Sequence, residues 1–253
     1  MTAILAARGL SAGYGGQPVV HDLDLEVDPG EVVCLLGPNG AGKTTTMLAL
    51  SGELAPLAGH VEFDGEVTKA PLHKRARRGL SYVTEERSVF KALSARDNLR
   101  CGGVQPRDAL AIFPELEKRL NVRGGLLSGG EQQMLTLARA LCRKPRLLLA
   151  DELSLGLAPL IVERLLQAVR AAADDRGTGV VIVEQHARKA LKYADRVLVI
   201  SRGRVRMTLS AAEARAQLDD IEAHYLSGAE AQDIARVVES ARGDGRRAAD
   251  PSS

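Results

Sequence analysis

The sequence has no tryptophan, and aromatic residues make up only 3% of its 253 residues. It also lacks any apolar run close to the ~20 residues that a helix needs to cross a bilayer. The longer runs, such as Val32 to Leu36, end far sooner. Residues 1–8 have neither the charged start nor the long apolar stretch of a secretory signal. These absences predict a chain that does not itself enter the membrane.

Cysteine is scarce, and the charges nearly cancel. The three cysteines, Cys34, Cys101 and Cys142, are odd in number and widely spaced, which excludes a disulfide framework and matches no metal-ligand spacing. The chain has 34 basic and 32 acidic residues, so it lacks the basic surface that nucleic-acid binding requires. We therefore expect a reducing cytoplasm and no nucleic-acid partner.

What the sequence does have is a globular composition, with 45% hydrophobic and 26% charged residues, close to the averages of folded domains. From about residue 146 onward, apolar strand patterns alternate with helical patterns, which favours parallel strands joined by crossover helices. The chain is therefore predicted to be an α/β protein. Strands are predicted at 23–27, 31–36, 60–63, 80–83, 146–150, 179–183 and 196–200, and helices at 43–50, 129–143, 160–173 and 187–194.

The segment from Glu85 to Leu126 contains short helical pieces and no convincing strand. Because strands precede and follow it, we expect a helical subdomain, about residues 86–140, inserted into a domain that spans residues 1–227. Residues 228–253 are rich in Ala, Arg, Asp and Gly. They are predicted to form a C-terminal extension that is largely mobile.

Residues 37–44, Gly-Pro-Asn-Gly-Ala-Gly-Lys-Thr, fit the G-x-x-x-x-G-K-[ST] pattern between a predicted buried strand and a helix. Glycines let backbone N–H groups approach phosphates closely, and the helix turns its positive end toward the same point. Lys43 can reach the β and γ phosphates, and the Thr44 hydroxyl can ligate Mg²⁺. A chance lysine after a glycine-rich turn is the alternative, and the strand-to-helix context argues against it. The residues predicted to bind ATP here are Gly37, Pro38, Asn39, Gly40, Ala41, Gly42, Lys43, Thr44 and Thr45.

Residues 127–133, Leu-Ser-Gly-Gly-Glu-Gln-Gln, begin a long predicted helix. Ser128 and Glu131 have the spacing of a capping box. Glycines are poor helix formers, yet Gly129 and Gly130 expose backbone N–H groups at the positive end of this helix. The heptapeptide therefore predicts a second anion site within the same chain.

This heptapeptide resembles the signature motif of the ATP-binding cassette (ABC) family, and the resemblance extends from about Ile4 to Leu226. It implies a P-loop core with a mostly parallel sheet, flanking helices, an N-terminal antiparallel β subdomain and an inserted helical subdomain. It also implies that Ser128, Gly129 and Gly130 cap the γ phosphate held by the phosphate loop of a second cassette. Neither chain would then complete a site alone.

Four more positions take their roles from the resemblance. Asp151 would hold Mg²⁺ and Glu152 would be the general base for the attacking water, although two acids at a strand end can also cap the next helix. His186 resembles the switch histidine that contacts the γ phosphate. Tyr14 resembles the aromatic residue that stacks on adenine, and a tyrosine in a glycine-rich turn can equally be a surface anchor. The expected catalytic residues are Lys43, Glu152 and His186.

Glu85 stands where most cassettes have a glutamine that senses Mg²⁺, and a carboxylate can still ligate that ion. This loop, together with Ser154 to Pro159, resembles the second ATPase subunit of branched-chain amino-acid importers and of related urea and amide importers. Thr84 and Leu153 replace two prolines of that branch. Loss of the second proline relaxes the backbone of Glu152, which predicts slower turnover. The expected Mg²⁺ ligands are Thr44, Asp151 and Glu85.

The resemblance implies an ATPase that drives import of branched-chain amino acids or a related small polar solute. Its expected partners are a second ABC ATPase (paralogous or identical), membrane permease subunits and, indirectly, a solute-binding protein. The permease would hold the chain at the cytoplasmic face of the inner membrane. Three alternatives stay open: an ATPase of a lipid or polysaccharide exporter, a cassette that acts on DNA or ribosomes, and a module that binds ATP without hydrolysing it.

Overall fold

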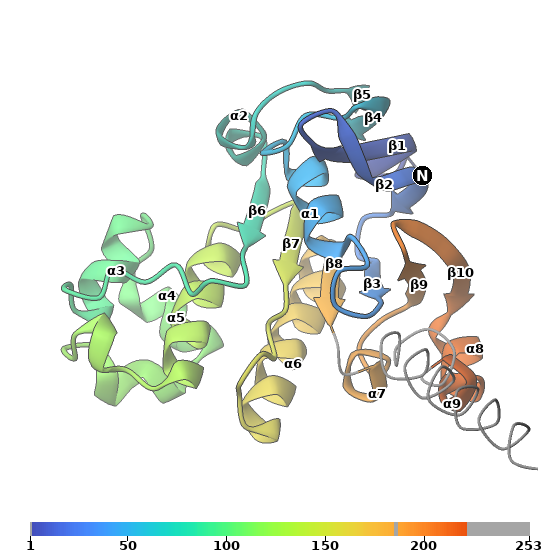
Figure 1. The fold of residues 1–253 in the computed structure, drawn as a ribbon. Coiled ribbons are helices and arrows are strands. Elements are labelled where there is room, and N and C mark those ends of the chain that lie inside the picture. The colour runs from blue at the N-terminus through green and yellow to red at the C-terminus, as the bar shows by residue number, and fades with distance from the viewer. Residues whose placement is uncertain (1, 185–186, 222–253) are drawn as a thin grey trace, which may run out of the picture.

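The computed structural model describes residues 2–184 and 187–221, and these form two sheets with helices around them (Figure 1). The smaller sheet is antiparallel and has the order β2-β1-β4-β5. Its strands are β1 (Leu5–Tyr14), β2 (Gln17–Val27), β4 (Ala58–Phe63) and β5 (Glu66–Val67). The predicted N-terminal antiparallel subdomain is therefore confirmed.

The larger sheet has six strands in the order β10-β9-β3-β8-β7-β6, and only β10 runs antiparallel to its neighbour. These strands are β3 (Val32–Leu36), β6 (Leu80–Val83), β7 (Leu147–Asp151), β8 (Gly179–Glu184), β9 (Arg196–Ser201) and β10 (Arg204–Ser210). Crossover helices connect the parallel strands, as the alternating pattern predicts. The α/β fold class is confirmed.

Successive residues of a strand point to opposite faces of the sheet, and both faces carry apolar side chains that other elements cover. In β3, Cys34 and Leu36 join a core formed with α5 (Gly129–Cys142) and α6 (Pro159–Arg176). Val33 and Leu35 join a second core formed with α1 (Lys43–Ser51) and the antiparallel sheet. A strand buried on both faces needs a continuous apolar run.

The helices between β6 and β7 gather to one side of the sheet (Figure 1). They are α3 (Ala95–Cys101), α4 (Pro106–Ile112), two 3₁₀ turns (Pro114–Arg119 and Gly124–Leu126) and α5. Asn98 is fully buried. Its side-chain oxygen accepts the Phe90 N–H (2.8 Å) and its side-chain nitrogen donates to the Ser94 carbonyl (2.9 Å), which fixes the chain entering α3. The segment is helical, as predicted, and its boundaries at about 86–140 stay a proposal.

The remaining helices are short, and one differs from its predicted length. They are α2 (Leu72–Arg77), α7 (Ala187–Ala190), α8 (Ala211–Ala216) and α9 (Leu218–Ile221). The sequence predicts that α7 continues to residue 194. Instead, the backbone hydrogen bonds become shorter in sequence span. Leu191 N–H donates to the Ala187 carbonyl four residues earlier, whereas Tyr193 N–H donates to the Ala190 carbonyl only three residues earlier. A tighter turn therefore replaces the last part of the helix. The predicted extension, residues 228–253, lies outside the described residues.

Among the described residues, no helix combines the length and apolar character that crossing a membrane requires.

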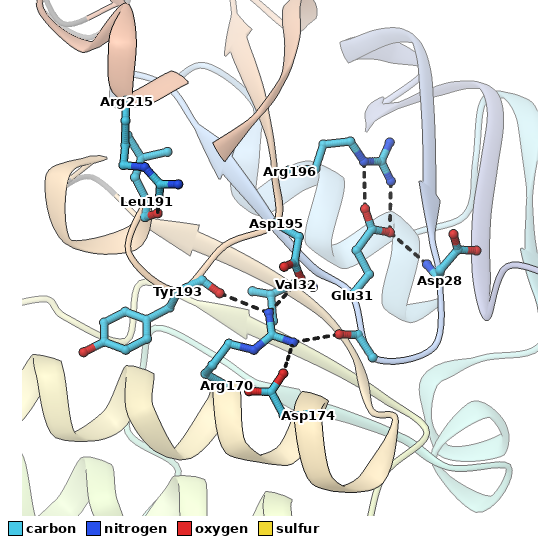
Figure 2. Close-up of polar contacts among 11 residues, drawn as sticks. Asp28, Glu31, Val32, Arg170, Asp174, Leu191, Tyr193, Asp195, Arg196 and Arg215 are labelled. Carbon is cyan, nitrogen blue, oxygen red and sulfur yellow. Dashed lines mark hydrogen bonds and ion pairs between the residues drawn. The ribbon is translucent and has the colours of Figure 1, made fainter. Parts of the chain in front are cut away.

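An ionic network joins α6 to the amino-terminal ends of β3 and β9 (Figure 2). The phosphate loop follows the opposite, carboxyl end of β3. Arg170 donates to Asp195 (2.7 Å) and to the Gly30 carbonyl (2.8 Å), and it pairs with Asp174 (2.7 Å). Asp195 in turn accepts the Val32 N–H at 2.8 Å. The network therefore ties together segments that are far apart in sequence.

The Arg170→Ala variant is expected to be less stable by about 1–2 kcal/mol, because the Gly30 carbonyl loses a charged donor while the two exposed carboxylates lose little. Thermal denaturation should show the melting temperature falling by about 2–6 °C. Arg107→Ala, which removes an 86% exposed side chain, is the control and should melt like the wild type. A melting temperature unchanged by Arg170→Ala would contradict the role given to this network.

Candidate active site

The phosphate loop connects β3 to α1, and its glycines are required for two different reasons. Gly40 (φ +77°) and Gly42 (φ +100°) adopt left-handed backbone conformations that other residues rarely accept. A Cβ on Gly37 would lie only 2.3 Å from the Ile200 carbonyl oxygen. Gly42 is the N-cap of α1, so the unpaired N–H groups of that helix begin at the loop.

Lys43 lies buried over this loop, with only 5% of its side chain exposed. Its Nζ donates to the carbonyls of Gly37 (2.8 Å) and Pro38 (3.0 Å) and lies 4.0 Å from Glu152 Oε1. Burial lowers the pKa of Lys43, and the nearby carboxylates of Glu152, Asp151 and Glu85 oppose that shift. The ammonium group is thus held where phosphates would enter the loop.

A cavity of about 430 Å³ opens above the loop. It joins the phosphate loop to Glu85, which follows β6, and to Glu152, which follows β7. Neighbouring parallel strands bring these residues to the same sheet edge, where open α/β sheets bind ligands. The cavity is lined by Val19, Asn39, Gly40, Gly42, Lys43, Thr44, Thr45, Glu85, Glu152 and Leu155.

Asp151 is the last residue of β7 and is 1% exposed, and its buried carboxylate oxygens have no donor other than the nearby Thr44 hydroxyl. Burial raises its pKa to about 6, and the nearby Thr44 hydroxyl opposes part of that rise. An unpaired buried carboxylate is costly unless a cation joins it. The residues therefore fit Mg²⁺, which favours oxygen ligands. No group of three or more His, Cys, Asp or Glu side chains in the described part of the chain could hold a metal alone, so phosphates would supply other ligands.

Glu152 follows Asp151 in a left-handed conformation (φ 48°), which is a strained backbone for a glutamate. Its N–H donates to the Val183 carbonyl (3.0 Å), and its own carbonyl accepts the Leu155 N–H (3.3 Å). Leu153, which replaces a proline of the resembling branch, is 1% exposed in the core. The chain lacks the restraint that a proline would place on Glu152, but the burial of Leu153 and these hydrogen bonds restrain it instead.

Ser128, Gly129 and Gly130 do not line this cavity. Ser128 caps α5 through the predicted capping box with Glu131, with bonds of 2.8 and 3.3 Å. A Cβ on Gly129 would touch the Arg87 guanidinium at 3.0 Å, and Gly130 packs on Ile161. Gly129 and Gly130 thus contact Arg87 and Ile161, and neither of these belongs to the phosphate loop.

Tyr14 and His186 complete the set of predicted residues. Tyr14 ends β1 and is 54% exposed, so its ring is available to a ligand. His186 lies outside the described residues. Ala41 is buried within the loop, where its carbonyl accepts the Gly203 N–H at 3.0 Å.

Glu184 is a residue of this site that the sequence analysis missed. It ends β8, is 1% exposed and accepts a hydrogen bond from the Ser154 hydroxyl. Its pKa is raised from 4.5 to about 7, mainly by burial; the hydrogen bond from Ser154 and the charge of Lys189 oppose this rise, and the charge of Glu152 contributes to it. The signal was present in the sequence, since period-two alternation puts this acid on the same strand face as Val180 and Ile182.

The raised pKa makes the stability of the fold depend on pH. Between pH 4.5 and about 7 the folded chain holds a proton on Glu184 that the unfolded chain has lost. Stability therefore falls as pH rises through this range and levels off above it. Relative to Glu184→Gln, the wild type should lose on the order of 2 kcal/mol between pH 5 and pH 8. Denaturant titrations measure this difference, and two curves that stay parallel in pH would contradict the buried acid.

The phosphate loop, the parallel sheet and the acidic end of β7 define a P-loop nucleotide-binding domain. The family model described as "ABC transporter" matches residues 20–154, more than half of the chain. The chain belongs to this family: it is an ATP-binding subunit of an ABC transporter, and it hydrolyses ATP.

Known proteins of this family resemble the chain over most of its length. The high-affinity branched-chain amino acid transport ATP-binding protein BraG of Pseudomonas aeruginosa is 41% identical over 214 residues, covering 81% of this chain and 91% of BraG. The lipopolysaccharide export system ATP-binding protein LptB of Escherichia coli K12 is 38% identical over 217 residues, covering 79% of this chain and 88% of LptB. A dimeric cassette bound to ADP and phosphate has the same fold, with a TM-score of 0.72 at 23% identity over 82% of this chain and 98% of that one.

Proposed function

We propose that this chain drives the import of branched-chain amino acids, or of a related small polar solute, through a membrane permease. The observation that carries this proposal is the 41% identity to BraG across four fifths of the chain. The Glu85 loop and the sequence from Ser154 to Pro159 support the same branch. The chain would act at the cytoplasmic face of the inner membrane, held there by the permease, with a solute-binding protein delivering the solute.

In this proposal the predicted site residues have separate tasks. Lys43 and the loop N–H groups hold the β and γ phosphates, while Tyr14 stacks on adenine. Glu152 orients and deprotonates the attacking water, assisted by His186. The ligands of Mg²⁺, whose charge would offset that of the phosphates, are Thr44, Asp151 and Glu85. The buried, unpaired oxygens of Asp151 support this assignment.

A second cassette, identical or paralogous, would complete the site. Ser128, Gly129 and Gly130 begin α5 but do not line the cavity of their own chain, which supports their use by a partner. Leu155, at the cavity rim, and Leu160 are 47% and 79% exposed. Exposed apolar side chains beside a polar site are typical of a surface that another protein covers.

The permease would bind at a groove of about 280 Å³ between α2, the edge strand β6 and α5. The groove is lined by the apolar or aromatic side chains of Leu72, Tyr82 and Val83, and by Arg139. A helix of the permease with an apolar face fits this lining. This contact would transmit closure of the nucleotide site to the membrane.

Export of lipopolysaccharide or a similar lipid is the second candidate, because LptB is nearly as similar as BraG, at 38% identity. The same ATPase site would serve either system, so the catalytic residues do not separate them. The partner subunits decide between the two functions.

Deletion of this chain from its host tests the proposal. We expect uptake of radiolabelled leucine, isoleucine or valine (or of urea or a short amide) to fall, and lipopolysaccharide in the outer membrane to stay normal. Wild-type chain should restore uptake, and Glu152→Gln should not, although both should copurify with the same permease. Normal uptake of all these solutes together with loss of surface lipopolysaccharide would overturn the importer in favour of the exporter.

A further inference from the structure

Glu184 lies between the phosphate loop and the catalytic glutamate. It ends β8, the strand between β3 and β7. On one side it pairs with Leu36, the residue before the phosphate loop. On the other side, the carbonyl of the preceding Val183 accepts the Glu152 N–H at 3.0 Å. Any shift at this strand end therefore reaches both the phosphate loop and the catalytic glutamate.

The side chain of Glu184 is placed at a cost in stability. It shares a strand face with Val180 and Ile182, which belong to the apolar core. It also lies near enough to Cys34 to contribute to the raised pKa of that thiol, which burial mainly causes. One carboxylate oxygen accepts from Ser154, which is 5% exposed, and the other is buried with no hydrogen-bond partner. An apolar residue of the same size would satisfy this position better. A buried acid that departs from this rule is typical of a functional site.

We propose that Glu184 is a positioning residue that fixes the catalytic loop through Ser154, so that the Glu152 carboxylate points at the γ phosphate. This inference rests on the proposed role of Glu152 as general base. Ser154 lies two residues after Glu152, whose left-handed backbone (φ 48°) would relax if released. The bond from the Glu152 N–H to the Val183 carbonyl holds the start of the loop. The bond from the Ser154 hydroxyl to Glu184 holds its next turn.

The positioning role separates catalysis from stability, and two variants test that separation. Glu184→Met fills the same volume without a charge, and Ser154→Ala removes the donor. In each variant we expect kcat for ATP to fall by about tenfold or more, since a shift of ~1 Å in a catalytic group costs up to about 100-fold. KM for ATP should stay within about twofold, because the phosphate loop is intact. The melting temperature of Glu184→Met should equal or exceed that of the wild type.

Two further variants serve as rescue and control, all assayed as full chains together with their partner cassette. Glu184→Gln keeps an oxygen that accepts from Ser154, so its kcat should exceed that of Glu184→Met. Thr178→Val removes a buried hydroxyl bond (2.8 Å to the Pro145 carbonyl) at the far end of β8. This control should melt at a lower temperature and keep the wild-type kcat per folded molecule.

Normal kcat in both Glu184→Met and Ser154→Ala, beside an inactive Glu152→Gln, would overturn the positioning role and leave the proposed function standing. A Glu184→Met variant that loses activity only in proportion to its unfolded fraction would also overturn it. Full turnover by Glu152→Gln would overturn the role of Glu152, and the inference with it.

Discussion

Glu152→Gln is expected to bind ATP with nearly wild-type affinity while its turnover falls by about two to four orders of magnitude. The amide has the shape of the carboxylate but cannot accept a proton from the attacking water. Lys43, 4.0 Å away, keeps its bonds to the loop carbonyls, so the phosphates still find their main cation. Binding of a fluorescent ATP analogue and release of phosphate measure the two quantities separately.

Glu117→Gln makes the same chemical change on the exposed surface of the helical segment and should leave both quantities unchanged. Near-normal turnover by Glu152→Gln would exclude Glu152 as the general base. The general base would then have to be another acid of the cavity, such as Glu85.

Lys43→Ala should weaken ATP binding by about 100-fold, the effect of losing one or two charge-assisted hydrogen bonds. The variant also removes the positive charge that the phosphate loop places near the carboxylates of Glu85, Asp151 and Glu152. These charges repel a triphosphate, so the loss should be larger at low salt than at high salt. Equilibrium binding at two ionic strengths measures both effects.

Lys118→Ala removes an exposed lysine from the helical segment and is the matched control, with no change in affinity expected at either salt concentration. Unchanged ATP affinity in Lys43→Ala would contradict the phosphate-loop assignment itself. Equal losses at high and low salt would remove the electrostatic part of the explanation.

The features predicted from the sequence are those that depend on local patterns. The continuous apolar run of β3 and the glycines around Gly42 determine a buried strand, a tight loop and a helix start within a few residues. The capping box of Ser128 and Glu131 is likewise local, and the structure contains both of its bonds. Such patterns hold in the fold because tertiary contacts reinforce them.

Features that depend on contacts between distant residues were not predicted. The alternating, half-exposed pattern of β10 becomes a strand only because β9 offers it an edge. Arg170 reaches Gly30 across 140 positions, and Ser154 reaches Glu184 across 30, so neither pair is visible to a search for short motifs. The predicted length of α7 was wrong for the same reason. The Arg215 side chain donates to the Leu191 carbonyl (2.6 Å) in the turn that replaces the end of this helix.

We infer that one chain holds only half of a working site, because Ser128–Gly130 lie away from the cavity that holds Lys43 and Glu152. ATP turnover per molecule, measured across a dilution series with the oligomeric state followed by sedimentation, tests this most directly. We predict that turnover falls toward zero as the last dimers, or complexes with a partner cassette, dissociate. A strictly monomeric preparation that hydrolyses ATP at the full rate of the assembled complex would contradict the account.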